Sequence, residues 1–275
     1  SLSGTKPWDE SEEAKALGIE TKPVIIGAYT ILKLTRYTGK KTAGDFVDDI
    51  VKVYQDIVKK CEKDQFAWVQ FDEPALVQDT SLEDITLFHR IYDKILADKG
   101  SCKILLQTYF GDVRDVYQEL IRMPFDGIGL DFLEGKETGH LIGRYGFPQE
   151  KVLFAGLVNG KNIWKNHYEK TLSVLKELKD KEIQTVLSTS CSLLHVPYTL
   201  QYEEKLSGEY KAYFAFAQEK LLELKELSEL ADQTSCQDNP AYQKNRRLFA
   251  GDRDCQKQEV TERLSKVTDQ DYTRL

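Results

Sequence analysis

WVQFDEPALV, residues 68–77, carries the clearest structural signal in this chain. An apolar run there leads directly into Asp72 and Glu73, and Pro74 follows. Apolar and β-branched residues favour a strand, whereas a proline cannot continue a sheet ladder because it has no backbone N–H. We therefore predict a buried strand that ends at this point and brings two carboxyl groups to the edge of a sheet.

Outward from this stretch, short apolar runs alternate with longer amphipathic ones from Lys22 to Leu230. This alternation is typical of parallel strands joined by crossover helices. The apolar runs are nearly continuous, which predicts strands that are dry on both faces. Six strands are expected, at residues 23–29, 67–71, 103–109, 125–131, 151–157 and 184–190.

The segments between these runs have apolar residues spaced by three and four positions, as on one face of a helix. Asp45, Ser81 and Asp112 are expected to begin three of these helices, because short polar side chains cap helix N-termini. The last and longest helix is predicted at about 203–230, where it closes the fold.

The chain of 275 residues fits one α/β barrel, which takes about 250 residues. Six β/α units are two fewer than a closed (β/α)8 TIM barrel needs, so the fold is either an open doubly wound sheet or an incomplete barrel. The start Ser1-Leu2-Ser3 lacks an initiator methionine and is interpreted as a cloning remnant, which favours the incomplete barrel. The expected organisation is a polar leader with a helix at 1–21, a barrel domain at 22–231, and a linker or docking segment at 232–275.

Composition excludes several classes of protein. The net charge is −7 with acidic and basic residues interspersed, which argues against a nucleic-acid surface. No apolar run approaches the roughly 20 residues of a membrane span. The five cysteines are an odd number without close pairs, which indicates neither a disulfide framework nor a metal knuckle. A cytoplasmic protein is expected.

Polar side chains gather where the predicted strands end. In parallel α/β folds the loops at the carboxyl ends of the strands form the working face. We therefore expect these positions to converge on one mouth. The candidate site residues are Tyr29, Asp72, Glu73, Tyr109, Asp131, Asn159, Ser190, Cys191 and His195.

Each of these signals has a competing interpretation. Asp72 and Glu73 could act as acid and base, but adjacent strand residues point to opposite sides, so one of them or both can be structural. Cys191 and His195 could form a nucleophile and base, or bind zinc with Asp72. A packing role is favoured for both, because a catalytic zinc needs three protein ligands and no second Cys or His is placed at another strand end.

Two further motifs have weak functional interpretations. Asn159 stands between Gly156 and Gly160 in a stretch that could approach a phosphate, but the spacing matches no phosphate-cradling loop. The basic residues between Lys33 and Lys41 could meet an anionic tail of a substrate. A solvated helix face is the favoured interpretation of that cluster.

Five blocks of sequence carry a resemblance to a known family. They read KPVIIG at 22–27, VQFDEPALV at 69–77, LQTYF at 106–110, AGLVNG at 155–160 and SCSLLH at 190–195. In this order they resemble the N-terminal half of cobalamin-independent methionine synthase. That family transfers a methyl group from 5-methyltetrahydropteroyltri-L-glutamate to homocysteine. The resemblance implies a protein of two face-to-face (β/α)8 barrels, the first derived from the second by duplication.

The resemblance also implies what this chain lacks. The family's zinc is held by His, Cys, Glu and Cys ligands of the C-terminal barrel, and none of those motifs occurs here. The family's folate contacts would precede Ser1, so no catalytic or metal residue is assigned. Asp72 and Cys191 are expected to be relics or structural residues. The chain is then expected to be a scaffold and one wall of the folate cleft, and to be inactive alone. Its expected partner is the C-terminal catalytic barrel of the same protein.

Two functions of other classes remain open. One is a self-sufficient metal-dependent lyase or decarboxylase on a barrel, which would use Asp72, Cys191 and His195. The other is a non-catalytic interaction module, in which the unpaired edges of an incomplete barrel bind another chain.

Overall fold

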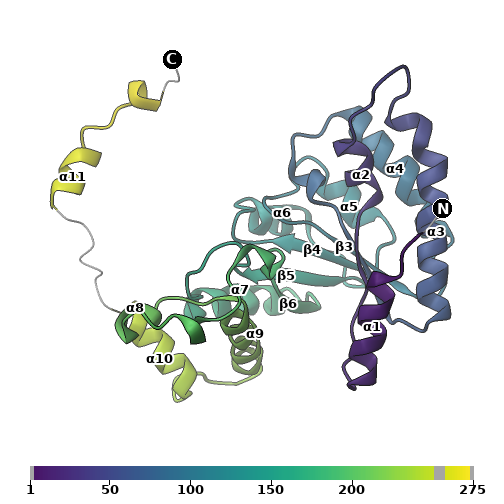
Figure 1. The fold of residues 1–275 in the computed structure, drawn as a ribbon. Coiled ribbons are helices and arrows are strands. Elements are labelled where there is room, and N and C mark those ends of the chain that lie inside the picture. Colours follow the sequence, from purple (N-terminus) through teal and green to yellow (C-terminus); the bar gives the residue numbers. More distant parts are fainter. Residues whose placement is uncertain (1–2, 251–257, 273–275) are drawn as a thin grey trace.

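Six parallel strands form one sheet whose spatial order, β1-β2-β3-β4-β5-β6, is the order of the sequence (Figure 1). The computed structural model describes residues 3–250 and 258–272. Each strand pairs with the next one along the chain, and within the described residues β1 and β6 do not meet. The strands are β1 Val24–Ile26, β2 Trp68–Asp72, β3 Lys103–Gln107, β4 Gly127–Asp131, β5 Val152–Val158 and β6 Thr185–Thr189.

The expected α/β fold is confirmed as an unclosed, barrel-type sheet with flanking helices. All six predicted strands are present, although the first is shorter than predicted because Ala28 already begins a helix. The α-helices are α1 Lys6–Ala16, α2 Ala28–Leu34, α3 Val47–Lys63, α4 Leu82–Ala97, α5 Tyr117–Arg122, α6 Thr138–Tyr145, α7 Tyr168–Asp180, α8 Gly208–Lys211, α9 Ala217–Ala231, α10 Pro240–Phe249 and α11 Gln258–Leu264. Short 3-10 turns lie at Ala43–Phe46, Pro74–Val77, Leu193–His195, Leu200–Tyr202 and Asp269–Tyr272.

The predicted helix starts are right at one position of three. Ser81 caps α4, because its hydroxyl accepts the backbone N–H of Asp84 while the Asp84 carboxylate accepts the backbone N–H of Ser81. Thr42 is the cap ahead of α3, and Asp45 is its partner within the turn. The prediction for Asp112 is wrong, because its carboxylate binds Arg114 and the next helix begins at residue 117.

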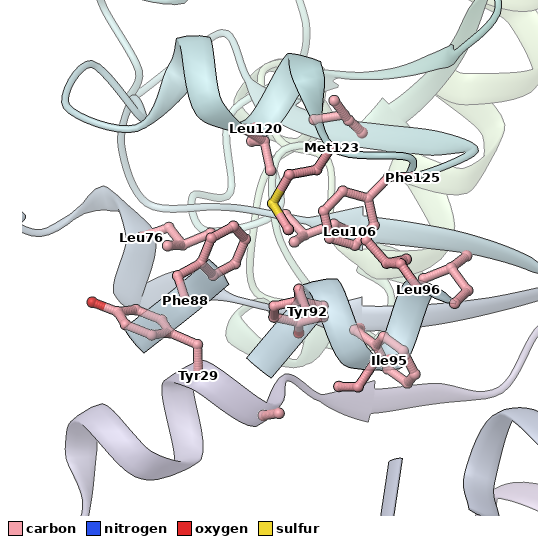
Figure 2. Packing of buried hydrophobic residues seen from close by; sticks show 14 of the residues in the cluster. Tyr29, Leu76, Phe88, Tyr92, Ile95, Leu96, Leu106, Leu120, Met123 and Phe125 are labelled. Carbon is pink, nitrogen blue, oxygen red and sulfur yellow. The ribbon is translucent and has the colours of Figure 1, made fainter. Parts of the chain in front are cut away.

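The main core lies between the outer face of the sheet and the helices that cover it. Figure 2 shows Phe88 and Tyr92 of α4 beside Leu106 of β3 and Phe125. The ring of Tyr92 lies 4.8 Å from that of Phe88 and 5.3 Å from that of Phe125, between centroids, in the range of favourable aromatic contacts. This aromatic layer fixes α4 against β2 and β3.

The inner face of the sheet is packed only at its centre. A Cβ added at Gly127 would lie 3.0 Å from the ring of Trp68, which shows how tightly this glycine is covered. At the two edges Val24 is 48%, Ile26 is 58% and Val186 is 41% exposed. The prediction of strands dry on both faces is therefore wrong for β1 and β6, because an unclosed sheet leaves the inner side of its edge strands uncovered.

The predicted single helix at 203–230 is also wrong, because tertiary contacts break it between α8 and α9. The backbone N–H of Ala215 donates to the carbonyl of Ile163 at 2.8 Å, so the intervening segment pairs with a distant loop. The carboxylate of Glu219 accepts the backbone N–H groups of Phe216 and Leu200, which starts α9 anew. Helix α9 then packs with α7 and α10 around a second, smaller apolar cluster of Val158, Tyr168, Leu227, Leu230 and Tyr242.

Candidate functional site

Asp72 is the carboxylate of the WVQFDEPALV stretch that faces the mouth at the strand ends. Its Oδ1 accepts a hydrogen bond from Gln70 Nε2 at 2.7 Å, and the Tyr109 hydroxyl lies 3.5 Å from its Oδ2. Burial raises the pKa of Asp72 above its usual value, and the positive charge of Lys22 acts against this rise. Asp72 and Tyr109 therefore lie together at the ends of β2 and β3.

Glu73 points to the opposite side, as strand alternation requires, and is fully buried. Its two oxygens accept the backbone N–H groups of Tyr29 at 2.9 Å and Thr30 at 2.7 Å, and the Tyr92 hydroxyl donates to it as well. A Cβ on Gly27 would overlap this carboxyl group, so glycine is required there. Burial raises the pKa of Glu73 to about 7. Glu73 thus holds the N-terminus of α2 against the sheet.

Tyr29 does not reach the mouth, because it belongs to the first turn of α2. Its ring packs edge-on against Phe88, with 5.8 Å between centroids, inside the outer core (Figure 2). Its place in the core is set by Glu73, 44 positions further along the chain. That contact is invisible in the local sequence.

Asp131 ends β4 and organises two loops at the mouth. Its carboxylate accepts the backbone N–H groups of Phe110 at 3.1 Å, Leu133 at 2.8 Å and Glu134 at 3.0 Å. Burial raises the pKa of Asp131, and these three N–H groups oppose the rise. The side chain has few lone pairs left for a substrate, so its role in this structure is to hold the loops.

Phe110 is a mouth residue that the sequence interpretation missed. Its backbone φ is +75°, a conformation that a bulky side chain rarely adopts. Its ring lies 4.7 Å from that of Tyr109 and 5.4 Å from that of His195. The Lys161 ammonium lies 5.2 Å from the Phe110 ring and 2.9 Å from a carboxylate oxygen of Glu134. Phe110 therefore joins the ends of β3, β5 and β6 into one aromatic and charged rim.

The ends of β5 and β6 are bonded mainly to each other. Ser190 Oγ accepts the backbone N–H of Gly160 at 3.2 Å. Asn159 Oδ1 accepts the backbone N–H groups of Lys161 at 2.8 Å and Asn162 at 2.9 Å. A Cβ on Gly160 would lie 2.3 Å from the Cys191 carbonyl oxygen, so this glycine serves close packing of two loops. Asn159 is engaged with its own loop, which gives the phosphate interpretation no support.

Cys191 and His195 do not form a nucleophile and base pair. Cys191 is buried, and burial raises the pKa of its thiol to about 11, which disfavours the thiolate. Its Sγ donates to the carbonyl of Ser192 at 3.7 Å, whereas the His195 ring packs on Phe110. Both contacts are those of packing residues.

The side chains of the mouth also do not fit a zinc ion. Within residues 3–250 and 258–272, no group of three His, Cys, Asp or Glu side chains is arranged to hold a metal. The structure therefore gives the zinc hypothesis for Asp72, Cys191 and His195 no ligand set among these residues. Cys255 lies outside the described residues.

The basic cluster lies at the end of α2 and in the segment that joins α2 to α3. Arg36, Lys40 and Lys41 line an open cavity of about 990 Å³ between α2 and α3. Lys33 instead forms an ion pair with Asp84 at 2.6 Å. Contact of this cluster with an anionic tail stays a prediction.

Comparison with known proteins gives concordant matches. The family model "Cobalamin-independent synthase, N-terminal domain" matches residues 1–183. The 5-methyltetrahydropteroyltriglutamate–homocysteine methyltransferase of Campylobacter jejuni subsp. jejuni serotype O:23/36 (strain 81-176) is 45% identical over 273 residues, which cover 99% of this chain and 36% of that protein. The protein of the same name from Lactococcus lactis subsp. lactis (strain IL1403) is 46% identical over 270 residues, 98% of this chain and 35% of that protein.

Solved structures share the fold at low sequence identity. A B12-independent methionine synthase from Shewanella sp. W3-18-1, in complex with selenomethionine, matches with a TM-score of 0.56 and 16% identity, over 84% of this chain and 67% of that one. A methyltransferase from Methanosarcina mazei matches with a TM-score of 0.51 and 12% identity, over 81% of this chain and 61% of that one. The chain spans about a third of the length of the curated relatives it matches. In the described part of the chain, no helix is both long and apolar enough to cross a membrane.

Proposed function

Since this chain belongs to the cobalamin-independent synthase family, as its N-terminal domain, we propose that it is part of an enzyme that methylates L-homocysteine to methionine. The methyl donor would be 5-methyltetrahydropteroyltri-L-glutamate. One observation carries the proposal: 99% of the chain aligns, at 45% identity, with a relative named for this activity. That relative is almost three times as long, so the proposed activity is that of a longer protein.

Within that protein, this chain would serve as scaffold and as one wall of the folate cleft. The contacts at the mouth support a structural role, because the side chains of Asp131, Asn159 and Ser190 accept hydrogen bonds from loop backbone N–H groups. The zinc that would activate homocysteine is assigned to ligands outside this chain. The proposed partner is a C-terminal catalytic barrel that faces the rim around Phe110. Free cysteines fit a reducing cytoplasm.

A methyl-transfer assay tests this proposal. The chain alone, the full-length protein and a separately expressed C-terminal region would each be given the triglutamyl folate, homocysteine and zinc. We expect methionine from the full-length protein and none from this chain, because the residues that bind zinc are not among its own. Turnover by this chain alone would refute its role as a scaffold, and an inactive full-length protein would refute the activity itself.

A further inference from the structure

Two free cysteines from different elements lie in contact at the end of the sheet opposite the mouth. Cys61 belongs to the last turn of α3, and Cys102 directly precedes β3. The Cys61 thiol donates a hydrogen bond to the sulfur of Cys102. The Cys102 thiol in turn donates to the carbonyl of Lys103 at 3.8 Å. The two sulfurs are therefore neighbours, although some 40 positions separate them in the sequence.

The backbone around the two cysteines is held together by a second set of contacts. The carboxylate of Glu62 accepts the backbone N–H of Ser101 at 3.0 Å and the Ser101 hydroxyl at 2.9 Å. A Cβ on Gly100 would lie 2.4 Å from the same carboxylate, so the two segments pack closely here. Glu62 follows Cys61 and Ser101 precedes Cys102, so the bonds between these neighbours keep the two cysteines facing each other.

The other described cysteines have different partners. The thiol of Cys191 donates to the carbonyl of Ser192 at 3.7 Å, and the thiol of Cys236 donates to the carbonyl of Leu230 at 3.2 Å. A thiol bonded to a carbonyl is a packing residue, whereas two thiols in contact can form a covalent bond with each other. The pair at 61 and 102 is therefore chemically distinct.

The pair is buried, but it lies directly beneath the surface. Cys61 is 0% and Cys102 is 2% exposed, whereas Ser101 and Lys103 on either side of Cys102 are exposed, and so is Glu62. The hydrogen bond from Cys61 lowers the pKa of the Cys102 thiol and outweighs the opposing effect of burial. Cys102 is then the sulfur that reacts first, as the thiolate. A molecule as small as hydrogen peroxide reaches it through local opening of these loop residues.

We propose that Cys61 and Cys102 form a redox modification site, at which hydrogen peroxide oxidises the two thiols to a disulfide. The Cys102 thiolate attacks one oxygen of the peroxide and the O–O bond breaks, which leaves a sulfenic acid on Cys102 and releases hydroxide, protonated to water by the proton that the thiol lost. The Cys61 thiol then attacks the sulfenic sulfur, the S–S bond forms and a second water leaves. In total the two thiols lose two protons and two electrons, and the peroxide is reduced to two waters.

The disulfide joins the C-terminal end of α3 to the start of β3 and closes a loop that contains β2 and α4. A cross-link across a loop of this length restricts the unfolded chain, so the oxidised chain unfolds at a higher temperature. The site lies at the amino ends of the strands. It is therefore distinct from the mouth and does not depend on the proposed methyl transfer.

Oxidation of the folded 275-residue chain tests this proposal. After treatment with hydrogen peroxide and removal of the excess, the remaining thiols are blocked with iodoacetamide in denaturant, and unreduced peptides are identified by mass spectrometry. We expect one linked pair of peptides, which contains Cys61 and Cys102, has lost two hydrogen atoms and separates in dithiothreitol. The melting temperature of the linked chain should lie roughly 5–10 °C above that of the reduced chain.

The variants Cys61→Ala and Cys102→Ala each remove one sulfur of the pair. In both, peroxide should give no linked peptide and no rise in melting temperature, and the two variants report on the same site if one of them does not fold. Cys236→Ala is the matched control, because the Cys236 thiol donates to a backbone carbonyl and its removal leaves the pair intact. It should form the same link and show the same rise.

Four results would overturn the proposal. They are iodoacetamide labelling of both Cys61 and Cys102 after peroxide treatment, a link that involves another cysteine instead, an unchanged melting temperature in the linked chain, and sulfinic acid on Cys102 without a link. The last result would show that the Cys61 thiol does not reach the sulfenic sulfur before further oxidation.

Discussion

The two faces of the sheet differ in how completely they are covered. On the outer face, Val69 and Phe71 of β2 are fully buried beneath helices. On the inner face, Gln70 and Asp72 of the same strand are only partly buried, and Val24, Ile26 and Val186 of the edge strands are exposed to solvent. The difference indicates that the outer face stabilises the chain, whereas the inner face and its mouth are the surfaces left for binding.

The largest expected effect on stability is a difference between two isoleucine-to-alanine substitutions, one on each face of the sheet. Ile104→Ala on the outer face of β3 should lower the free energy of unfolding by about 4 kcal/mol, because Ile104 is fully buried in the core. Ile26→Ala on the inner face of β1 should cost less than about 0.5 kcal/mol, because Ile26 is mostly exposed. Urea denaturation measures both. Equal losses would contradict the assignment of stability to the outer face.

The two adjacent carboxylates provide a second matched pair. Glu73→Ala should cost about 3 kcal/mol, because it leaves the backbone N–H groups of Tyr29 and Thr30 buried and unpaired. Asp72→Ala should cost less than about 1 kcal/mol, because its surroundings are partly open to water. The measurement is again urea denaturation at pH 7. A larger loss from Asp72→Ala would reverse the two roles.

This pair also shows how far the sequence leads. The strands and the strand-end position of Asp72 follow from local apolar runs. The role of Glu73 does not, because it depends on Gly27 and α2, which approach from more than 40 positions earlier in the sequence. The one local sign of this contact is Gly27, which lies just before Tyr29 and Thr30, the residues whose backbone N–H groups Glu73 accepts.

Another error has the same physical origin. The apolar spacing at 203–230 fits one helix, but Glu219 forms hydrogen bonds with Leu200 and Phe216 and stops it from continuing. By contrast, the sequence favours a packing role for Cys191 and His195, and in the structure a 3-10 turn directs the His195 ring toward Phe110. Local patterns predict elements, whereas contacts between elements decide where side chains point.

The pH dependence of the unfolding free energy tests the buried carboxylate of the pair, Glu73. Burial raises the pKa of Glu73 in the folded chain to about 7, above the usual 4.5 of the unfolded chain. The folded state therefore binds this proton more tightly, and its stabilisation is lost as the pH rises through 7. The unfolding free energy of the native chain, relative to that of Glu73→Gln, should fall between pH 5 and 8. Parallel curves would show that Glu73 titrates normally.

The smallest effect is expected at the open edges of the sheet. Val24 and Ile26 of β1 and Val186 of β6 expose apolar side chains next to strand edges that no other strand pairs with among residues 3–250 and 258–272, a combination that favours self-association. We expect the isolated chain to form weak, concentration-dependent dimers in sedimentation equilibrium. The double variant Ile26→Lys/Val186→Lys should remain monomeric at the same concentrations while its unfolding free energy changes by less than about 1 kcal/mol. Tyr202→Lys replaces an exposed aromatic in a 3-10 turn outside both edge strands; it is the control and should dimerise as the native chain does. A monomeric native chain would show that exposed inner-face side chains alone do not make this surface an interface.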